Sequence, residues 1–172
     1  AGLLRALQAR GYEADIVEIP FKHYPPERIL DHVLACRLLD LSEAFGNTID
    51  RLIGLKFPAY AVPHPHKVLW ILHQHRPAYD LWEHPQAGDL KYAPNGCYIR
   101  DTIRQADREF IGEARAVFAN SRNVAERLRL GCGITAEPLY HPPPGAESFY
   151  CERARDYILF PSRINLLKRQ KL

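Results

Sequence analysis

The chain has 172 residues, 47% hydrophobic and 25% charged, with a formal net charge of +3. This is ordinary globular composition, long enough for one sizeable core. No stretch approaches the roughly 18 apolar residues of a membrane span. No clustered basic patch suitable for nucleic acid precedes Lys168-Arg169-Gln170-Lys171, so a nucleic-acid partner is not expected.

The first 50 residues predict two helices with a strand between them. Leucines within residues 1–10 share one helical face, and Gly11 follows as a stop signal. Residues 14–19 (ADIVEI) have the composition of a strand. Pro25-Pro26 then opens a second helix, because proline is tolerated in the first turn, and the apolar residues of 29–38 keep the helical period.

The middle of the chain predicts strands that alternate with helices. Residues 50–54 (DRLIG), 68–72 (VLWIL) and 116–120 (AVFAN) have the apolar composition of strands, and residues 97–114 have helical spacing. Strands alternating with helices indicate parallel β-α-β units with right-handed crossovers. We therefore predict an α/β fold with a doubly wound parallel sheet, in which the apolar runs VLWIL and AVFA are covered on both faces.

The last third predicts one more helix, two strands and a linker. Ser121 stands where an N-cap belongs, before a helix over 122–130 that Gly131 is expected to close. Residues 137–140 and 156–160 (DYILF) predict strands, and the proline-rich stretch between them indicates an interdomain linker. Because the chain begins inside a helix and ends between a strand and a helix, we expect a piece of a longer protein.

Four histidines flank the 68–72 strand: His64, His66, His73 and His75. Imidazole is a common zinc ligand, so a four-histidine zinc site is one alternative. Geometry opposes it, because the strand that separates the two pairs spans roughly 17 Å at about 3.3 Å per residue. We expect His64, His66 and His75 to be surface loop residues. His73 is the first residue past the carboxyl end of a parallel strand, where ligands bind, so we predict a functional role for it.

Two further segments follow predicted strand ends. Gly54-Leu55-Lys56 follows the strand at 50–54, and Asn120-Ser121 follows the AVFA strand. Ser121 has a complete explanation as a helix cap. The plain alternative for Lys56 is a solvated surface charge, and nothing in the sequence decides its role.

Two cations near the end of the chain suggest an anion site. Arg163 follows the predicted strand at 156–160, and Lys168 comes five residues later, near the start of an expected helix. A helix N-terminus already favours an anion, and a diphosphate would suit two cations there. The alternative is a basic, solvated terminus, since basic residues crowd the last five positions.

The stretch 156–172 resembles the opening of the second domain in the retaining glycosyltransferases of family 4, the group 1 glycosyl transferases with two Rossmann-like domains (GT-B). In that family a strand is followed by Gly-Arg and, about five residues later, by a Lys, and the Arg and Lys hold the diphosphate of the donor. Arg163 and Lys168 match these positions, whereas Ser162 stands in place of the glycine.

Earlier segments resemble the same family in the same order. AVFANSRNVAERLR (116–129) is similar to the strand, Asn-Ser and helix near the end of its first domain, and YHPPPG (140–145) to its interdomain passage. WILHQHRPAYDLW (70–82) is similar to the strand that precedes a histidine at the cleft. That histidine contacts the donor sugar near the reacting carbon, and His73 matches it.

The resemblance implies a domain organisation. Residues 1–145 would form an N-terminal, Rossmann-like, acceptor-side domain that lacks its first strand, and residues 146–172 would form the linker and the beginning of a C-terminal nucleotide-sugar-binding domain. The glycine-rich loop after the first strand and the paired glutamates of the second domain would lie outside this chain. We therefore expect the isolated fragment to be inactive.

The resemblance also implies an activity for the full-length protein: transfer of a hexose from a nucleotide diphosphate-sugar to a carbohydrate or lipid-linked acceptor hydroxyl, with retention and without a metal or other cofactor. A cytoplasmic protein is expected, peripheral to the membrane when the acceptor is a lipid. The alternatives are a non-catalytic nucleotide-sugar-binding or interaction module of the same fold, a sugar-nucleotide epimerase, and the zinc-binding domain.

Overall fold

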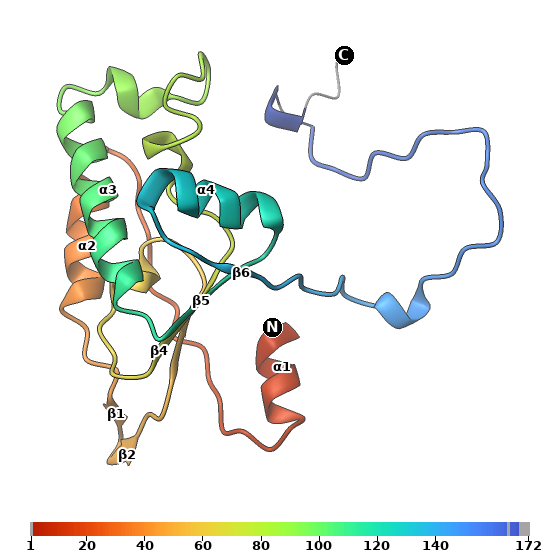
Figure 1. The fold of residues 1–172 in the computed structure, drawn as a ribbon, viewed down its shortest axis with the longest axis horizontal. Helices are drawn as coiled ribbons and strands as arrows, with labels where there is room; N and C mark the ends of the chain where they lie inside the picture. Colours follow the sequence, from red (N-terminus) through yellow and green to blue (C-terminus); the bar gives the residue numbers. More distant parts are fainter. Residues whose placement is uncertain (1, 165, 169–172) are drawn as a thin grey trace. The chain divides into compact units, whose positions relative to one another are not determined.

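The structure is a computed structural model that describes residues 2–164 and 166–168, and it has an α/β fold built on a parallel sheet (Figure 1). The sheet has the strand order β3-β4-β5-β6, with bounds β3 (Leu52–Gly54), β4 (Lys67–Ile71), β5 (Ala116–Ala119) and β6 (Glu137–Pro138). The α-helices are α1 (Gly2–Gln8), α2 (Arg28–Arg37), α3 (Gly96–Gly112) and α4 (Arg122–Cys132). A separate antiparallel pair is formed by β1 (Glu43–Ala44) and β2 (Asn47–Thr48). The predicted α/β class with a parallel sheet is confirmed.

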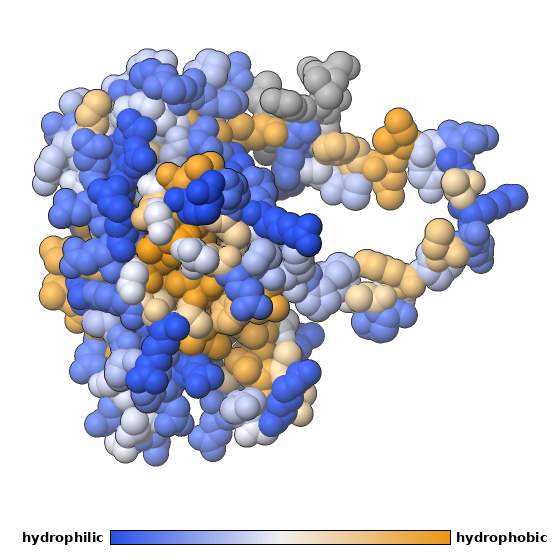
Figure 2. All heavy atoms as spheres, in the orientation of Figure 1, coloured by the Kyte–Doolittle hydropathy of each residue, from blue (hydrophilic) through white to orange (hydrophobic). Residues whose placement is uncertain are grey.

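The core lies between one face of the sheet and helices α2, α3 and α4. Leu69 and Ile71 of β4 and Ala119 of β5 are fully buried there. Trp70 and Phe118, which are paired in register, alternate with these residues and are only half-buried on the opposite face. Apolar side chains gather over the strands between α4 and α1 (Figure 2).

The described residues therefore bury one face of the strands fully and cover the other face only in part. The strand order follows the chain order, and α3 and α4 both contribute to the core on the face of Leu69, Ile71 and Ala119. The described strands follow one another in chain order, so the finer prediction of a doubly wound sheet, in which this order reverses, stays a prediction.

Helix α4 begins as predicted and ends later than predicted. Ser121 is extended (φ −163°), and its Oγ accepts a hydrogen bond from the Val124 amide at 3.2 Å, which confirms it as the N-cap. The prediction that Gly131 closes the helix is wrong. The helix continues to Cys132, and Gly133 ends it in the left-handed conformation (φ 71°) that favours glycine.

The predicted strand at 14–19 is absent from the structure. The segment is irregular, and Ile16 and Val17 are largely exposed. A strand needs a neighbour for its backbone N–H and C=O groups, and no described strand pairs with this stretch. Strand-like composition alone therefore does not produce a strand here.

The chain divides into two compact units, Ala1–His141 and Pro142–Leu172. In the second unit, the predicted strand at 156–160 is also absent, and Ile158 is 96% exposed. The reason is again the lack of a partner strand, because the described part of this unit contains no strand that could pair with residues 156–160. The described elements of the unit are two short 3₁₀ turns, Ala146–Ser148 and Leu166–Lys168.

None of the helices in the described part of the chain combines the length and apolar character needed to span a bilayer.

Candidate functional site

The carboxyl ends of the parallel strands meet at one edge of the sheet, which we call the carboxyl edge. The backbone hydrogen bonds between the strands continue past the strand ends at this edge. The Leu72 amide donates to the Leu55 carbonyl at 3.3 Å, and the Asn120 amide donates to the Ile71 carbonyl at 3.1 Å. His73 directly follows Leu72 in the chain. The structure thus brings Leu55, His73 and Asn120, which follow three different strands, to the same edge, where ligands of open α/β sheets bind.

The His73 side chain is exposed, and one of its ring nitrogens has a defined partner. Nδ1 lies 2.8 Å from the backbone carbonyl oxygen of Gln74. A carbonyl oxygen only accepts, so Nδ1 must carry the proton in this bond. In the neutral ring, Nε2 then carries a lone pair and can accept a hydrogen bond from a ligand hydroxyl.

The start of α4 supplies polar groups to the same edge. The Ser121 hydroxyl is occupied as the helix cap, as predicted from the sequence. The Arg122 amide donates to the Tyr140 hydroxyl at 3.3 Å, so the segment after β6 also contacts this helix end. The edge therefore combines an imidazole acceptor with the positive end of a helix dipole.

A buried carboxylate lies in the core behind this edge. Asp107 of α3 is 1% exposed and accepts hydrogen bonds from Tyr60 (3.0 Å to Oδ1) and Tyr79 (2.7 Å to Oδ2). Burial raises the pKa of Asp107 to about 7, although both tyrosine hydrogen bonds favour the charged form. Burial also raises the pKa of Tyr79, and the neighbouring Asp107 charge adds to that increase.

Polar contacts continue from Tyr79 to the loop that carries His73. The Tyr79 hydroxyl lies 3.2 Å from Cys132 Sγ, and the Gln74 side-chain amide donates to the same sulfur at 3.0 Å. Gln74 and Cys132 are both buried, and burial raises the pKa of the thiol. A Cβ at Gly131 would lie only 2.9 Å from the Tyr79 ring, which explains a glycine inside α4.

His75 differs from its expected role as a surface loop residue. Its ring lies 5.0 Å from the ring of Phe57 and 6.2 Å from that of Phe21, and it is only partly exposed. Burial lowers the pKa of His75 to about 4, so its ring is neutral at neutral pH. The prediction fails because the loop after β4 folds back onto aromatic side chains instead of extending into solvent.

The opposite, amino end of β4 holds a second charged cluster. Lys67 is 1% exposed, and its Nζ donates to the Tyr60 carbonyl at 3.0 Å and to Glu113 at 2.9 Å. Glu113 also receives two hydrogen bonds of 2.8 Å from Arg37. Burial opposes ionisation of Glu113, but the bonds from Arg37 and Lys67 outweigh it and hold the pKa of this carboxyl below its usual value. These mutually paired charges fasten α2 and α3 to β4.

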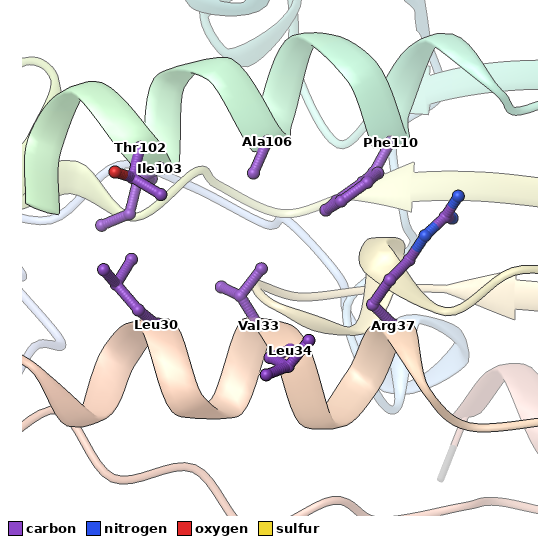
Figure 3. A pocket seen from close by; sticks show the side chains of 8 residues that line it. All are labelled: Leu30, Val33, Leu34, Arg37, Thr102, Ile103, Ala106 and Phe110. Atoms are coloured by element: carbon purple, nitrogen blue, oxygen red, sulfur yellow. The ribbon is translucent and has the colours of Figure 1, made fainter.

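Two concavities lie away from the carboxyl edge. One, of about 210 Å³, is an apolar groove between α2 and α3 (Figure 3), lined by Leu30, Val33, Leu34, Arg37, Thr102, Ile103, Ala106 and Phe110. The Arg37 guanidinium is stacked 4.5 Å from the centroid of the Phe110 ring. The other, of about 720 Å³, borders the Arg37–Glu113 pair and His64. His73 lines neither of these two concavities.

The predicted diphosphate-binding residues lie in the second unit. Arg163 and Lys168 are both exposed, and Lys168 is the last residue of the Leu166–Lys168 turn. The basic residues at 169 and 171, and the expected helix after Lys168, lie outside the described residues. Arg163 and Lys168 therefore remain predictions that rest on their spacing.

The histidine pairs lie at opposite ends of β4, as predicted from the sequence. His64 Nε2 is 2.9 Å from the Ile49 carbonyl, and His66 Nδ1 is 2.8 Å from the Asp50 carbonyl, both before the strand. Within residues 2–164 and 166–168, no three His, Cys, Asp or Glu side chains gather in a way that could hold a metal ion.

Sequence reasoning missed Asp107 and its partners. Ile99, Ile103, Asp107 and Ile111 form one buried row with a spacing of four residues along α3. A carboxylate inside such an apolar row is the signal that could have identified it, because an unpaired buried charge is costly. Its partners Tyr60 and Tyr79 lie too far away in sequence to be assigned from the pattern.

No protein-family model, curated protein or solved structure matches the chain.

Proposed function

We propose that the protein is a retaining glycosyltransferase of the GT-B type, which transfers a sugar from a nucleotide diphosphate-sugar to an acceptor hydroxyl. The observation that carries the proposal is His73, which follows β4 at the carboxyl edge with Nδ1 bonded to the Gln74 carbonyl. Its Nε2 can then accept a hydrogen bond from a sugar hydroxyl. In this proposal, residues 1–145 belong to the acceptor-side domain of a doubly wound fold, and residues 146–172 begin the donor-side domain.

Arg163 and Lys168 are the proposed ligands of the donor diphosphate. As the bond between the sugar and the diphosphate breaks, negative charge develops on the diphosphate while the sugar becomes cationic. Fixed positive groups directed at this charge lower the barrier. A guanidinium can bind two phosphate oxygens at once, and an ammonium adds a compact charge. The two side chains would take this role without a metal ion.

His73 has a positioning role toward the donor sugar in the proposed reaction. Nε2 would accept a hydrogen bond from a sugar hydroxyl, and this bond would orient the reacting carbon. The acceptor hydroxyl loses its proton to an oxygen of the departing diphosphate, and the acceptor oxygen forms the new bond on the face that the diphosphate leaves. His73 is not required as a general base in this scheme. The compartment expected for such a reaction is the cytoplasm, or its membrane surface when the acceptor is a lipid.

A panel of nucleotide-sugars incubated with the full-length protein and candidate acceptors tests the proposal. Release of nucleotide diphosphate, together with a glycosylated acceptor, is the expected result. Binding of a nucleotide-sugar without any turnover would instead identify a non-catalytic module. A new nucleotide-sugar without acceptor dependence would identify an epimerase, and stoichiometric zinc in the purified protein would favour the zinc-binding alternative.

A further inference from the structure

We propose that Asp107, Tyr79, Cys132 and Gln74 form a buried positioning relay that sets the tautomer and orientation of His73. These four residues, called the relay below, come from α3, from the segment after β4 and from the end of α4. They connect the core to the exposed histidine through consecutive polar contacts of 2.7 Å, 3.2 Å and 3.0 Å. The role that the relay serves rests on the function proposed for His73.

The donors and acceptors of the relay can be assigned in one consistent direction. The Tyr79 hydroxyl has a single proton and donates it to Asp107. In the contact between Tyr79 and Cys132, the thiol must then be the donor. The sulfur in turn accepts a hydrogen bond from the side-chain amide of Gln74. Among the described contacts, this amide donates to no other group. Every donor thus points toward the buried carboxylate, and the three contacts polarise one another.

Gln74 links the relay to His73 because its two ends have different partners. Its side chain is buried and bonded to Cys132, whereas its backbone carbonyl accepts the proton of His73 Nδ1. Fixing the side chain fixes the orientation of residue 74, and therefore the direction of the carbonyl. If the side chain lost its anchor, the carbonyl could rotate and the ring could exchange tautomers.

The packing around the relay leaves little freedom for another arrangement. A Cβ at Gly131 would approach the Tyr79 ring to 2.9 Å and the Gln74 side-chain nitrogen to 3.5 Å. The Arg104 guanidinium lies 5.5 Å from the centroid of the Tyr79 ring. Tyr60 holds the second oxygen of Asp107 at 3.0 Å. The relay is thus a network of three buried side chains and the partly buried Tyr79, and it leads to the exposed side chain of His73.

For the reaction, the relay would keep Nδ1 protonated and Nε2 available as an acceptor. The other neutral tautomer carries its proton on Nε2 and could not accept from a sugar hydroxyl. Because catalytic geometry tolerates little displacement, loss of the relay is expected to lower kcat by about 10- to 100-fold. KM for the donor is expected to change less, since the diphosphate contacts are left intact.

The tautomer of His73 can be measured directly by two-bond ¹H–¹⁵N correlation spectra of its ring at pH 8, assigned by loss of the signals in His73→Gln. The wild type is expected to show the Nδ1–H form. Cys132→Ala and Gln74→Met should shift the ring toward the Nε2–H form, and Cys132→Ser should restore the original spectrum, because its hydroxyl can make the same two bonds. This spectrum needs no nucleotide-sugar, so its result is independent of the test of sugar transfer.

Cys36→Ala is the matched control, since it removes another buried sulfur from the core without contact to the relay. Its spectrum should equal that of the wild type. The proposal is overturned if Cys132→Ala keeps the Nδ1–H form as completely as Cys36→Ala does. Should Cys132→Ala fail to fold, Gln74→Met, which nearly preserves side-chain volume, decides the question by the same criterion.

Discussion

Asp107→Asn is expected to be more stable than the wild type at pH 8, and to lose this advantage as the pH falls toward 4. The asparagine amide is neutral at every pH. Its oxygen can accept from one tyrosine hydroxyl, and its nitrogen can donate to the other, so the hydrogen bonds at the site are retained.

The direction of this pH dependence follows from the raised pKa of Asp107. Burial raises the pKa of Asp107 from 3.8 to about 7, so between these values the folded protein holds a proton that the unfolded chain has released. The stability contributed by this group is complete below about pH 4 and declines as the pH rises to 7. One pKa unit corresponds to about 1.4 kcal/mol, so the whole decline amounts to roughly 4 kcal/mol.

Urea unfolding of both proteins from pH 5 to pH 8 measures the effect. The difference in the free energy of unfolding should grow in favour of Asp107→Asn as the pH rises, and should level off above pH 7. Asp101→Asn, which removes a carboxylate from the exposed side of the same helix, is the control for loss of charge. A difference between Asp107→Asn and the wild type that stays constant over this range would show that Asp107 is charged throughout.

The second large effect is expected at Arg163 and Lys168, the residues proposed to bind the diphosphate. Arg163→Ala should weaken binding of a nucleoside diphosphate to the full-length protein by about 10- to 100-fold, because one charge-assisted contact contributes about 1.5–3 kcal/mol. The double change Arg163→Ala with Lys168→Ala should abolish measurable binding. Isothermal titration at constant ionic strength is the appropriate measurement, because salt screens exposed charges.

Two exposed arginines serve as matched controls for this effect: Arg155 in the same unit and Arg122 at the start of α4. Replacing either arginine with alanine removes one positive charge from the protein. Each variant therefore reports the nonspecific electrostatic contribution to nucleoside diphosphate binding. Their loss should change the dissociation constant by less than about twofold. Equal weakening in all three single variants would mean that the anion responds to net charge and that Arg163 has no specific contact with it.

The sequence was sufficient to predict the fold class and the elements that bury a complete apolar face. β4 and α3 were located almost to their ends, because an apolar run and a row of isoleucines leave few alternatives. Ser121 was identifiable as a cap because its bond is local. The sequence failed where structure depends on a partner: residues 14–19 and 156–160 have strand composition but no described strand to pair with.

The candidate site could be predicted only in part, and for a similar reason. The position of His73 follows from the end of the strand, which is a local feature. Its link to Asp107 depends on contacts between residues from 28 to 58 positions apart, such as Tyr79 with Asp107 and Gln74 with Cys132. Sequence spacing does not reveal such pairs. The buried Lys67 was overlooked for the same reason, because its partner Glu113 is 46 positions away.

In the proposed function, the protein transfers a sugar from a nucleotide diphosphate donor with retention, Arg163 and Lys168 bind the diphosphate, and His73 positions the sugar. The most direct test is the anomeric configuration of the product, followed by NMR while the full-length protein acts on donor and acceptor in the presence of a metal chelator. We predict a glycosylated acceptor that has the same anomeric configuration as the donor. An inverted product, or an unchanged donor across a complete panel of nucleotide-sugars and acceptors, would contradict the claim.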